Sequence, residues 1–339
     1  MPKTAIITGV TGQDGAYLAR RLLNDGDIVV GTYRAPNFWR LQELGVAGHD
    51  RLELVEHDLK DLGSSIRLLD RIKPDEVYNL AAQSAVHASF NQPVSTAEVT
   101  GIGALNMLES IRIVNEHIRF YQASTSELFG NAAEAPQTEE TPFYPRSPYA
   151  VAKLFAHWAT VNYREAFGMF CSAGILFNHE SPLRGESFVT RKISKGVAEI
   201  HAGRRDCIEL GNLNVQRDWG YAEEYVDGMI RMLRNDAPDT FVLATNRSES
   251  VRRFVELSFQ VIGVEISWRG EGETEIGFST NASAPLVKIN PKFYRPADVT
   301  LIKGDASKAE SRLGWRAKTN LEELCALMVK RDLDRIDAS

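Results

Sequence analysis

The chain has 339 residues, of which 43% are hydrophobic and 25% are charged, and its formal net charge is −6. This length suits two domains or one large domain with an added lobe, and this composition is typical of a folded globular protein. The acidic balance argues against a nucleic-acid-binding surface, and no apolar run approaches the roughly 18 residues that a membrane span needs. The three cysteines, Cys171, Cys207 and Cys325, are too far apart to suggest a disulfide framework or a metal site. They predict a reducing compartment, and the expected location is the cytoplasm.

A glycine-rich turn follows the first predicted strand, at residues 4–8. Gly9, Gly12 and Gly15 are spaced three apart, and an amphipathic run at residues 16–24 reads as a helix. A strand, a glycine turn and a helix together form the arrangement that places a dinucleotide pyrophosphate at a helix N-terminus. The alternative is a tight turn that binds no ligand.

The second predicted strand, at residues 27–32, leads to Arg34, and the next acidic residue is Glu43. An acidic residue after this strand would contact the ribose of NAD, whereas an arginine suits the 2′-phosphate of NADP. We therefore interpret the site as one for NADP, with Arg34 on the phosphate. A solvent-exposed loop arginine is the alternative.

Strands and helices continue to alternate through the first half of the chain. Predicted strands at 52–56 and 76–80 are each followed by a helical pattern, at 64–72 and at 93–115. Asp58 follows the first of these strands and would either accept a hydrogen bond from an adenine amino group or cap the next helix. This alternation predicts an α/β fold, a Rossmann-type doubly wound parallel sheet with a smaller α/β substrate-binding lobe.

Four polar residues converge around a predicted buried strand that ends near residue 123. Thr125 and Glu127 come directly after it, where open α/β sheets place their ligands. Tyr149 and Lys153 are four residues apart and share one face of a helix. An ammonium beside a phenol lowers the phenol pKa, so this pair suits proton exchange. The alternative is a tyrosine and a lysine on the surface of an ordinary helix.

The glycine turn, the run Ala81-Ala82-Gln83-Ser84 and the Tyr149/Lys153 pair resemble the extended short-chain dehydrogenase/reductase family. Longer motifs resemble, in order, the GDP-mannose 4,6-dehydratase branch of that family. They are Ser124-Thr-Ser-Glu127, Pro142-Phe-Tyr-Pro-Arg-Ser-Pro-Tyr149, Phe177-Asn-His-Glu-Ser-Pro-Leu-Arg-Gly185, Phe188-Val-Thr-Arg-Lys-Ile193, Arg217-Asp-Trp-Gly220 and Tyr294-Arg-Pro296. Relatives usually carry paired arginines in a longer loop after the second strand, whereas here Ala35-Pro36 follows Arg34.

The resemblance implies an enzyme that converts GDP-mannose to GDP-4-keto-6-deoxy-mannose while recycling NADP. It implies a role for each matching residue. The catalytic residues would be Thr125, Glu127, Tyr149 and Lys153. The NADP contacts would be Gly9, Gly12, Gln13, Asp14, Arg34, Asp58, Leu59, Ala81, Gln83, Lys153, His179 and Arg184. The nucleotide-sugar contacts would be Asn178, Val189, Lys192, Arg217 and Arg295.

The second half of the chain is less regular. We expect a Rossmann domain over residues 1–175 and a nucleotide-sugar-binding lobe over 176–339, with residues 231–260 as a candidate for return to the main sheet. Long loops are expected at 177–187 and 270–297, the latter as a lid over an anionic ligand. His179 has no partner at metal-ligand spacing, so no metal is expected. A homo-oligomer, either a dimer or a tetramer, is expected.

Three other functions remain open from the sequence. The same chemistry on a GDP-linked manno-heptose would need changes only in the pocket beyond C6. A nucleotide-sugar epimerase or reductase would share Tyr149 and Lys153 but would not need an acid/base at Glu127. A redox-sensing NADP-binding regulator would have little use for the four polar residues.

Overall fold

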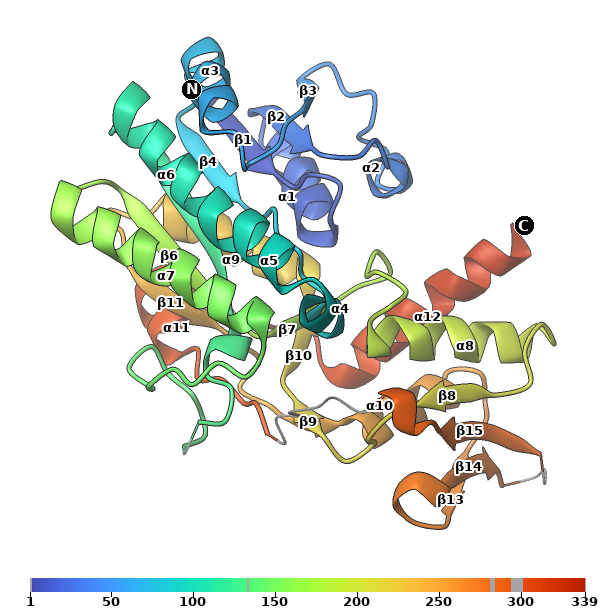
Figure 1. The fold of residues 1–339 in the computed structure, drawn as a ribbon. Helices are drawn as coiled ribbons and strands as arrows, with labels where there is room; N and C mark the ends of the chain where they lie inside the picture. The colour runs from blue at the N-terminus through green and yellow to red at the C-terminus, as the bar shows by residue number, and fades with distance from the viewer. Residues whose placement is uncertain (1, 133, 281–283, 294–300, 339) are drawn as a thin grey trace.

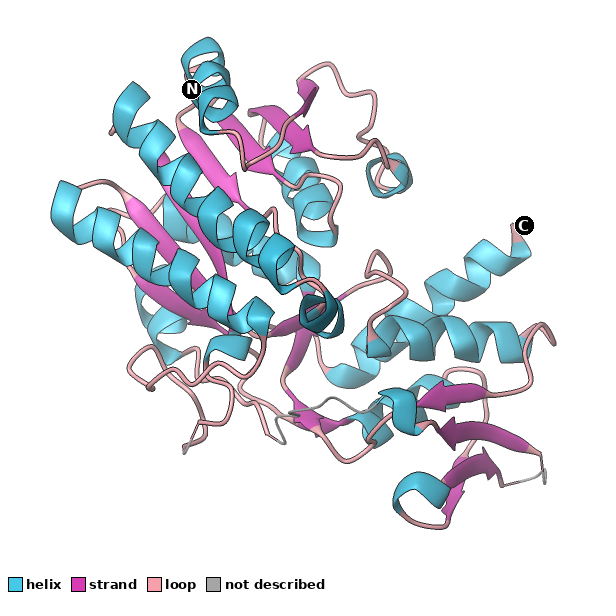
Figure 2. Ribbon diagram, in the orientation of Figure 1, coloured by secondary structure: helices cyan, strands magenta, loops and turns pink. Residues whose placement is uncertain are grey.

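A seven-stranded parallel sheet forms the centre of the larger part of the molecule (Figures 1 and 2). The computed structural model describes residues 2–132, 134–280, 284–293 and 301–338. Along the sheet the strands are β11 (Thr240–Leu243), β6 (Cys171–Leu176), β5 (Arg119–Thr125), β4 (Glu76–Asn79), β1 (Thr4–Thr8), β2 (Ile28–Tyr33) and β3 (Leu52–Glu56). The order reverses between β1 and β4, which is the doubly wound Rossmann arrangement, so the predicted fold class is confirmed.

Helices cover both faces of this sheet, so its central strands are buried along almost their whole length. One face carries α3 (Leu62–Ile72), α6 (Gly103–Val114) and α7 (Pro148–Phe167); the other carries α1 (Gln13–Asn24) and α9 (Ala222–Leu233) (Figure 1). Every residue of β6 is buried, as is every residue of β5 after the first. Strands buried on both faces read as continuous hydrophobic runs rather than alternating ones.

The helix expected over residues 93–115 is three consecutive segments. They are α5 (Pro93–Thr96), a π-helical stretch η1 (Ala97–Ile102) and α6, and the short helix α4 (Val86–Asn91) precedes them. The helix expected from residue 64 begins at Leu62 instead. Asp61 is its N-cap, because the Asp61 carboxylate accepts a 2.9 Å hydrogen bond from the backbone N–H of Ser64. The alternative role of Asp58 as this cap is therefore wrong.

A four-stranded sheet and three helices form the smaller lobe, at the lower right of Figure 1. Its strands are β13 (Ile266–Arg269), β14 (Ile276–Ser279), β15 (Pro285–Ile289) and β8 (Ile208–Leu210), and its helices are α8 (Val189–His201), α10 (Val251–Gln260) and α12 (Leu321–Asp337). Ile193, Phe254 and Met328 lie in a hydrophobic cluster of their own, separate from the two clusters that flank the large sheet. The expectation of one long loop over 270–297 is wrong where the chain is described, because β14 and β15 lie within it. These two strands pair with each other, and β15 also pairs with β8, which lies far away in the sequence.

Two short strand pairs connect the large sheet with the lobe. Strand β7 (Asn178–Glu180) pairs in parallel with β10 (Trp219–Tyr221), and β9 (Gln216–Arg217) pairs antiparallel with β12 (Glu249–Ser250). Helix α2 (Trp39–Glu43) follows β2, and α11 (Ser307–Leu313) packs beside β11 and α9. Of the helices in the described parts of the chain, none is both long enough and apolar enough to cross a membrane.

Candidate active site

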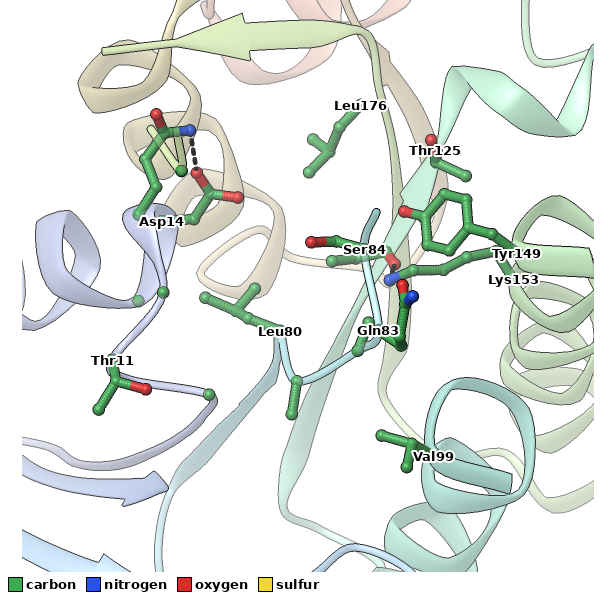
Figure 3. Close-up of a pocket in the computed structure, with 18 of the residues that line it drawn as sticks. Thr11, Asp14, Leu80, Gln83, Ser84, Val99, Thr125, Tyr149, Lys153 and Leu176 are labelled. Carbon is green, nitrogen blue, oxygen red and sulfur yellow. Dashed lines mark hydrogen bonds between the residues drawn. The ribbon is translucent and has the colours of Figure 1, made fainter. Parts of the chain in front are cut away.

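A cavity of about 580 Å³ lies at the carboxyl ends of the strands of the large sheet (Figure 3). The loops after β1, β2, β3 and β4 and the ends of β5 and β6 all contribute to its walls. Among the predicted site residues, those that line it are Gly9, Gly12, Gln13, Asp14, Arg34, Asp58, Leu59, Ala81, Gln83, Thr125, Glu127, Tyr149, Lys153, Asn178, His179 and Arg184. The structure therefore brings all the predicted catalytic residues and all the predicted cofactor contacts to one cavity.

The glycine turn brings backbone close to backbone at the edge of this cavity. Gly9 has a φ of +72°, and a Cβ atom there would lie 2.9 Å from the Cα of Ala81. A Cβ at Gly15 would lie 2.5 Å from the carbonyl oxygen of Gly9. Side chains at either position would push the turn apart, so both need glycine. Helix α1 then begins after Gly12 without a side-chain cap.

Asp14 and His179 form a nearly buried ion pair that joins the turn to β7. The ring Nε2 lies 2.9 Å from Asp14 Oδ2, and Nδ1 lies 2.7 Å from the carbonyl oxygen of Phe177. Both ring nitrogens thus face acceptors, which suits the doubly protonated ring. Burial alone would raise the pKa of Asp14, but the charge and hydrogen bond of His179 lower it to about 2. Burial would likewise lower the pKa of His179, but Asp14 outweighs this and raises it.

Gln13 adds two further bonds between the same segments. Its Nε2 donates to the carbonyl oxygen of His179 over 3.0 Å, and its Oε1 accepts from the hydroxyl of Ser181 over 2.8 Å. The turn that follows β1 is therefore tied to the chain that follows β6.

The start of helix α7 places Tyr149 and Lys153. The Ser147 hydroxyl oxygen caps the helix by accepting from the backbone N–H of Ala150 over 3.1 Å, and a proline occupies the first turn. Tyr149 lies in that first turn and Lys153 one turn later, and they are only 8% and 4% exposed. Both side chains reach from α7 toward the cavity, with Thr125 beside the Tyr149 ring (Figure 3). The Lys153 ammonium donates a 2.6 Å hydrogen bond to the carbonyl oxygen of Ala123 and lies 6.0 Å from the Tyr149 ring centroid.

Burial dominates the acid–base properties of this pair. It raises the pKa of Tyr149 above its ordinary value; interaction with the Thr125 side chain opposes this, and the charge of Glu127 adds to it. Burial lowers the pKa of Lys153 to about 8. The expectation that the phenol pKa is lowered is therefore wrong for this structure, because burial destabilises the phenolate more than the neighbouring side chains stabilise it.

Thr125 and Glu127 follow from the way β5 ends. Thr125 is its last residue, and its hydroxyl oxygen accepts from the backbone N–H of Glu127 over 3.3 Å, which starts the short 3₁₀ turn η2 (Ser126–Leu128). The Glu127 side chain is half-buried and lines the cavity with Tyr149. A hydroxyl, a phenol, an ammonium and a carboxylate thus share one space.

A second arginine lies beside the predicted phosphate contact. Arg34 is exposed and lines the cavity at the end of β2. Arg40, on α2, lines the same cavity and donates to the carbonyl oxygens of Leu183 and Thr11 over 2.7 Å and 2.9 Å. The sequence did not single out Arg40, because no local pattern shows that α2 folds back onto the glycine turn.

The predicted nucleotide-sugar contacts are more dispersed. Asn178 lines the main cavity, and its buried Oδ1 accepts no hydrogen bond from the described residues. Lys192 lines a second cavity of about 350 Å³, with its Nζ 3.3 Å from the Phe293 ring centroid. Val189 and the buried Arg217 line neither cavity, and Arg295 lies outside the described residues.

The second cavity contains Lys288, which the sequence placed in the loop expected to cover an anionic ligand, and two charges, Arg205 and Glu209, that the sequence did not indicate. Arg205, Lys288 and Glu209 line it together with Lys192. They meet because β8 and β15 are neighbours in the smaller sheet, a pairing that local patterns do not reveal.

His157 is a further residue near the site that the sequence patterns did not identify. It lies on α7 one turn beyond Lys153 and is 3% exposed, and its Nδ1 is 2.8 Å from the hydroxyl oxygen of Ser124. Burial lowers the pKa of His157 to about 4, so the ring is neutral at pH 7. Helix spacing alone would have placed it on the same face as Lys153.

No group of three or more possible metal ligands occurs among the residues that the structure describes.

Solved structures with the same fold include nucleotide-sugar enzymes. A UDP-glucose 4-epimerase from Thermotoga maritima with UDP-glucose matches 99% of this chain and 100% of its own, with a TM-score of 0.82 and 22% identity. A dTDP-glucose 4,6-dehydratase from Bacillus anthracis in complex with NAD matches 99% of this chain and 98% of its own, with a TM-score of 0.82 and 16% identity. RMD from Pseudomonas aeruginosa, complexed with NADPH, matches 98% and 99%, with a TM-score of 0.77 and 21% identity. At these identities the likeness shows the fold alone.

Sequence comparison is more specific. The family model described as GDP-mannose 4,6 dehydratase matches residues 6–328. The GDP-mannose 4,6-dehydratase of Sinorhizobium fredii is 51% identical, covering 98% of this chain and 97% of its own. The Homo sapiens GDP-mannose 4,6 dehydratase is 45% identical, covering 97% and 91%. The chain therefore belongs to the GDP-mannose 4,6-dehydratase family.

Proposed function

We propose that this chain removes water from GDP-mannose to give GDP-4-keto-6-deoxy-mannose. The observation that carries the proposal is the position of Glu127 in the same cavity as Tyr149 and Lys153. A tyrosine–lysine pair suffices for oxidation or reduction at a sugar carbon. Elimination across C5 and C6 needs one more acid/base group, and Glu127 supplies a carboxylate at that place.

NADP is the cofactor that we propose for this cavity. The fit rests on the close approach of Gly9 to Ala81, which leaves backbone exposed to a pyrophosphate, and on the uncapped N-terminus of α1. The buried Oε1 of Gln83 accepts no hydrogen bond from the described residues and faces the same cavity, as expected of a ligand contact. Arg34 offers its guanidinium to a 2′-phosphate. Asp58 and Leu59 line the wall expected to face the adenine.

The residues of this chain divide the reaction between them. Bound NADP supplies the hydride acceptor for C4 and the hydride that later reaches C6. Tyr149 takes the proton from the C4 hydroxyl, and Thr125 holds that oxygen. Glu127 then removes the C5 proton, which the neighbouring C4 ketone has made acidic, and gives a proton to the C6 hydroxyl, which leaves as water. A proton returns to C5 in the last step.

Lys153 has two roles in this scheme. Its ammonium stabilises the phenolate form of Tyr149, the form that accepts the C4 hydroxyl proton in the first step, and it would hold the ribose next to the nicotinamide. A lysine whose pKa is about 8 loses its proton at a lower pH than an exposed lysine does. The first step is thus expected to depend on pH around this value.

The nucleotide end of the substrate is assigned to Asn178, Val189, Lys192, Arg217 and Arg295. Among these, Asn178 has a buried carbonyl oxygen facing the main cavity. Lys192 brings a positive charge to the second cavity, which suits an anionic ligand. This division would leave the sugar in the main cavity and the nucleotide toward the lobe.

Two further proposals concern the state of the protein. We infer a homo-oligomer, since Val151, Phe155 and Trp158 on α7 are 56%, 46% and 54% exposed and recur at helical spacing on one face. We also infer a cytoplasmic location, because Cys171, Cys207 and Cys325 are all free thiols.

One experiment tests the function directly. Purified protein with NADP is offered GDP-mannose and GDP-manno-heptose side by side, and mass spectrometry follows the loss of one water. We expect dehydration of GDP-mannose. Protein that binds NADP but dehydrates neither sugar would overturn the proposal, and turnover of the heptose alone would correct the substrate.

A further inference from the structure

A row of buried polar side chains crosses the large sheet beneath the cavity. Thr8 on β1, Asn79 on β4 and Gln122 on β5 are register neighbours, with Thr8 opposite Asn79 and Asn79 opposite Gln122. They are 0%, 1% and 1% exposed. Buried amides and hydroxyls in the interior of a parallel sheet are unfavourable unless each atom has a partner.

Hydrogen bonds link this row to Lys153. The Thr8 hydroxyl donates to Asn79 Oδ1 over 2.7 Å, and Asn79 Nδ2 donates to Gln122 Oε1 over 2.8 Å. Gln122 Nε2 donates over 3.0 Å to the carbonyl oxygen of Ala123, the atom that also accepts the Lys153 ammonium at 2.6 Å. The row therefore ends at the carbonyl oxygen of Ala123, which also accepts the hydrogen bond from Lys153.

Thr8, the first residue of the row, determines the direction of these hydrogen bonds. The backbone N–H groups of Leu80 and Ala81 both donate to the Thr8 hydroxyl oxygen, each over 3.1 Å. A backbone N–H can only donate, so the hydroxyl must use its single proton on Asn79. Asn79 must then present its carbonyl oxygen to Thr8 and its NH₂ group to the next strand.

The same reasoning sets the orientation of Gln122. Its carbonyl oxygen must face the NH₂ of Asn79, so its own NH₂ must face the carbonyl of Ala123. The reversed amide would set donor against donor at one end and acceptor against acceptor at the other. Every bond thus points toward Ala123, and bonds aligned head to tail polarise one another.

We propose that Gln122 is a positioning residue for Lys153, and that it acts as the last member of a one-way hydrogen-bonded ladder formed with Thr8 and Asn79. A backbone carbonyl has two lone pairs. Gln122 engages one of them, which leaves the other directed at the ammonium. The last register pair between β4 and β5 is Asn79 with Gln122, and Ala123 is the next residue of β5. The pairing of β4 with β5 therefore does not engage the carbonyl oxygen of Ala123. The consequence for the reaction rests on the proposed role of Lys153, whereas the ladder itself does not.

The experiment measures the titration of Lys153 in Gln122→Met, which keeps the length of the side chain and removes the amide. The parental and variant proteins are labelled with ¹⁵N-lysine, and Lys153→Met identifies the resonance. In the parent, burial lowers the pKa of Lys153 to about 8. In the variant we expect the pKa to fall by about one further unit, because the charged form loses a well-aimed acceptor. With GDP-mannose, kcat should fall about 10-fold at unchanged KM, since the ladder does not touch the nucleotide.

Two controls separate this role from a general loss of packing. Ser172 on β6 is buried, and its hydroxyl has no hydrogen-bond partner among the described residues, so Ser172→Ala should leave the Lys153 titration in place. Thr8→Val removes the first donor of the ladder and should shift the titration in the same direction as Gln122→Met but less, while Thr8→Ser restores the hydroxyl and the parental value. The Thr8 pair gives the result even when Gln122→Met does not fold.

An unchanged Lys153 titration in Gln122→Met, or in Thr8→Val where only that variant folds, would overturn the inference. An equal shift in Ser172→Ala would overturn it too. Because the titration needs no substrate, its outcome is independent of the proposed reaction. A shifted Lys153 titration in the variants, with no dehydratase activity in the parental protein, would support the ladder and refute the proposed function. Dehydratase activity in the parental protein, with an unshifted titration in the variants, would support the function and refute the ladder.

Discussion

The two ends of the large sheet differ in whether particular buried polar oxygens have hydrogen-bond partners. At the amino ends of its strands, Glu76 is fully buried and its carboxylate is saturated, with Lys3 at 2.5 Å, Arg234 at 3.1 Å and the Tyr78 hydroxyl at 2.9 Å. At the carboxyl ends, the buried oxygens of Gln83 and Asn178 accept no hydrogen bond from the described residues. Glu76 thus links several segments at the amino ends, whereas the carboxyl ends combine paired groups, such as Asp14 with His179, with two amide oxygens that remain available. Where a buried polar atom lacks a partner, a ligand site is the first explanation to test.

The largest expected effect lies at the carboxyl ends and separates Tyr149 from Glu127. Tyr149→Phe removes the proton acceptor for the first step, so no reduced cofactor should form from GDP-mannose. Glu127→Gln leaves that step possible but cripples elimination, so reduced cofactor should accumulate. Single-turnover absorbance with NADP and GDP-mannose should stay flat for the first variant and rise for the second. General acid–base losses of about 10²–10⁴-fold are readily measured.

Parental turnover in Glu127→Gln would remove Glu127 from the mechanism. Rising absorbance in Tyr149→Phe would show that another group accepts the first proton. Lys153→Met serves as the comparison, because it should weaken the first step while leaving Glu127 intact.

The next effect is expected at the amino ends, on stability alone. Arg234→Ala leaves the buried carboxylates of Glu76 and Asp27 short of a partner. The free energy of unfolding should fall by about 3 kcal/mol, the low end for breaking a buried pair, because Lys3 remains. Chemical denaturation measures this. The control is Arg67→Ala, whose ion pair with Asp61 spans 3.8 Å with side chains 74% and 58% exposed, and which should change little. A loss of kcat in Arg234→Ala at full folding would contradict the division between the two ends.

A pH effect should follow from the neutral histidine behind the catalytic helix. The folded pKa of His157 is about 4 and that of an unfolded histidine is about 6.5, so the unfolded chain takes up the proton first. The free energy of unfolding should therefore fall as the pH drops from about 6.5 to about 4, by about 2 kcal/mol at pH 4.5. His157→Gln should reduce this fall, as measured by denaturation at pH 7 and pH 4.5.

The control for His157 is Ser124→Ala, which removes the hydrogen bond to the ring but leaves the ring buried. It should keep the pH dependence, because burial is the main cause of the lowered pKa of His157. An identical loss of pH dependence in both variants would assign the effect to the hydrogen bond instead.

An effect of similar size distinguishes the two arginines near the adenosine end. Arg34→Ala should weaken NADP more than NAD by about 10- to 150-fold, the equivalent of a charge-assisted contact of roughly 1.5–3 kcal/mol. Arg40→Ala should weaken both cofactors alike, because Arg40 binds the carbonyl of Thr11 in the glycine turn. Binding titrations with both cofactors measure this, and equal weakening in Arg34→Ala would rule out 2′-phosphate recognition by Arg34.

Local patterns predicted β1 to β5 of the large sheet, because these strands are short segments with apolar residues and nearby turn signals, whereas β11 was anticipated only as a possible return of residues 231–260 to the sheet. The glycine turn and the Tyr149/Lys153 pair were likewise visible, since their spacing is local. The Thr8–Asn79–Gln122 row was not, because it depends on the register between three strands. Strands β14 and β15 were mistaken for loop for the same reason. The phenol pKa was misjudged because burial, which the sequence does not reveal, outweighs the nearby side chains.

The place of β11 at the edge of the sheet has a consequence for biosynthesis. Its residues, Thr240–Leu243, pair with β6, which emerges from the ribosome long before them. At about 5–20 residues per second, β6 waits several seconds with an unpaired edge, and α9 is also missing for most of that time. An unpaired edge strand is a template for wrong pairing. A nascent chain in which β6 has emerged from the ribosome and β11 has not should therefore be a client for chaperones, and one in which β11 has also emerged should not.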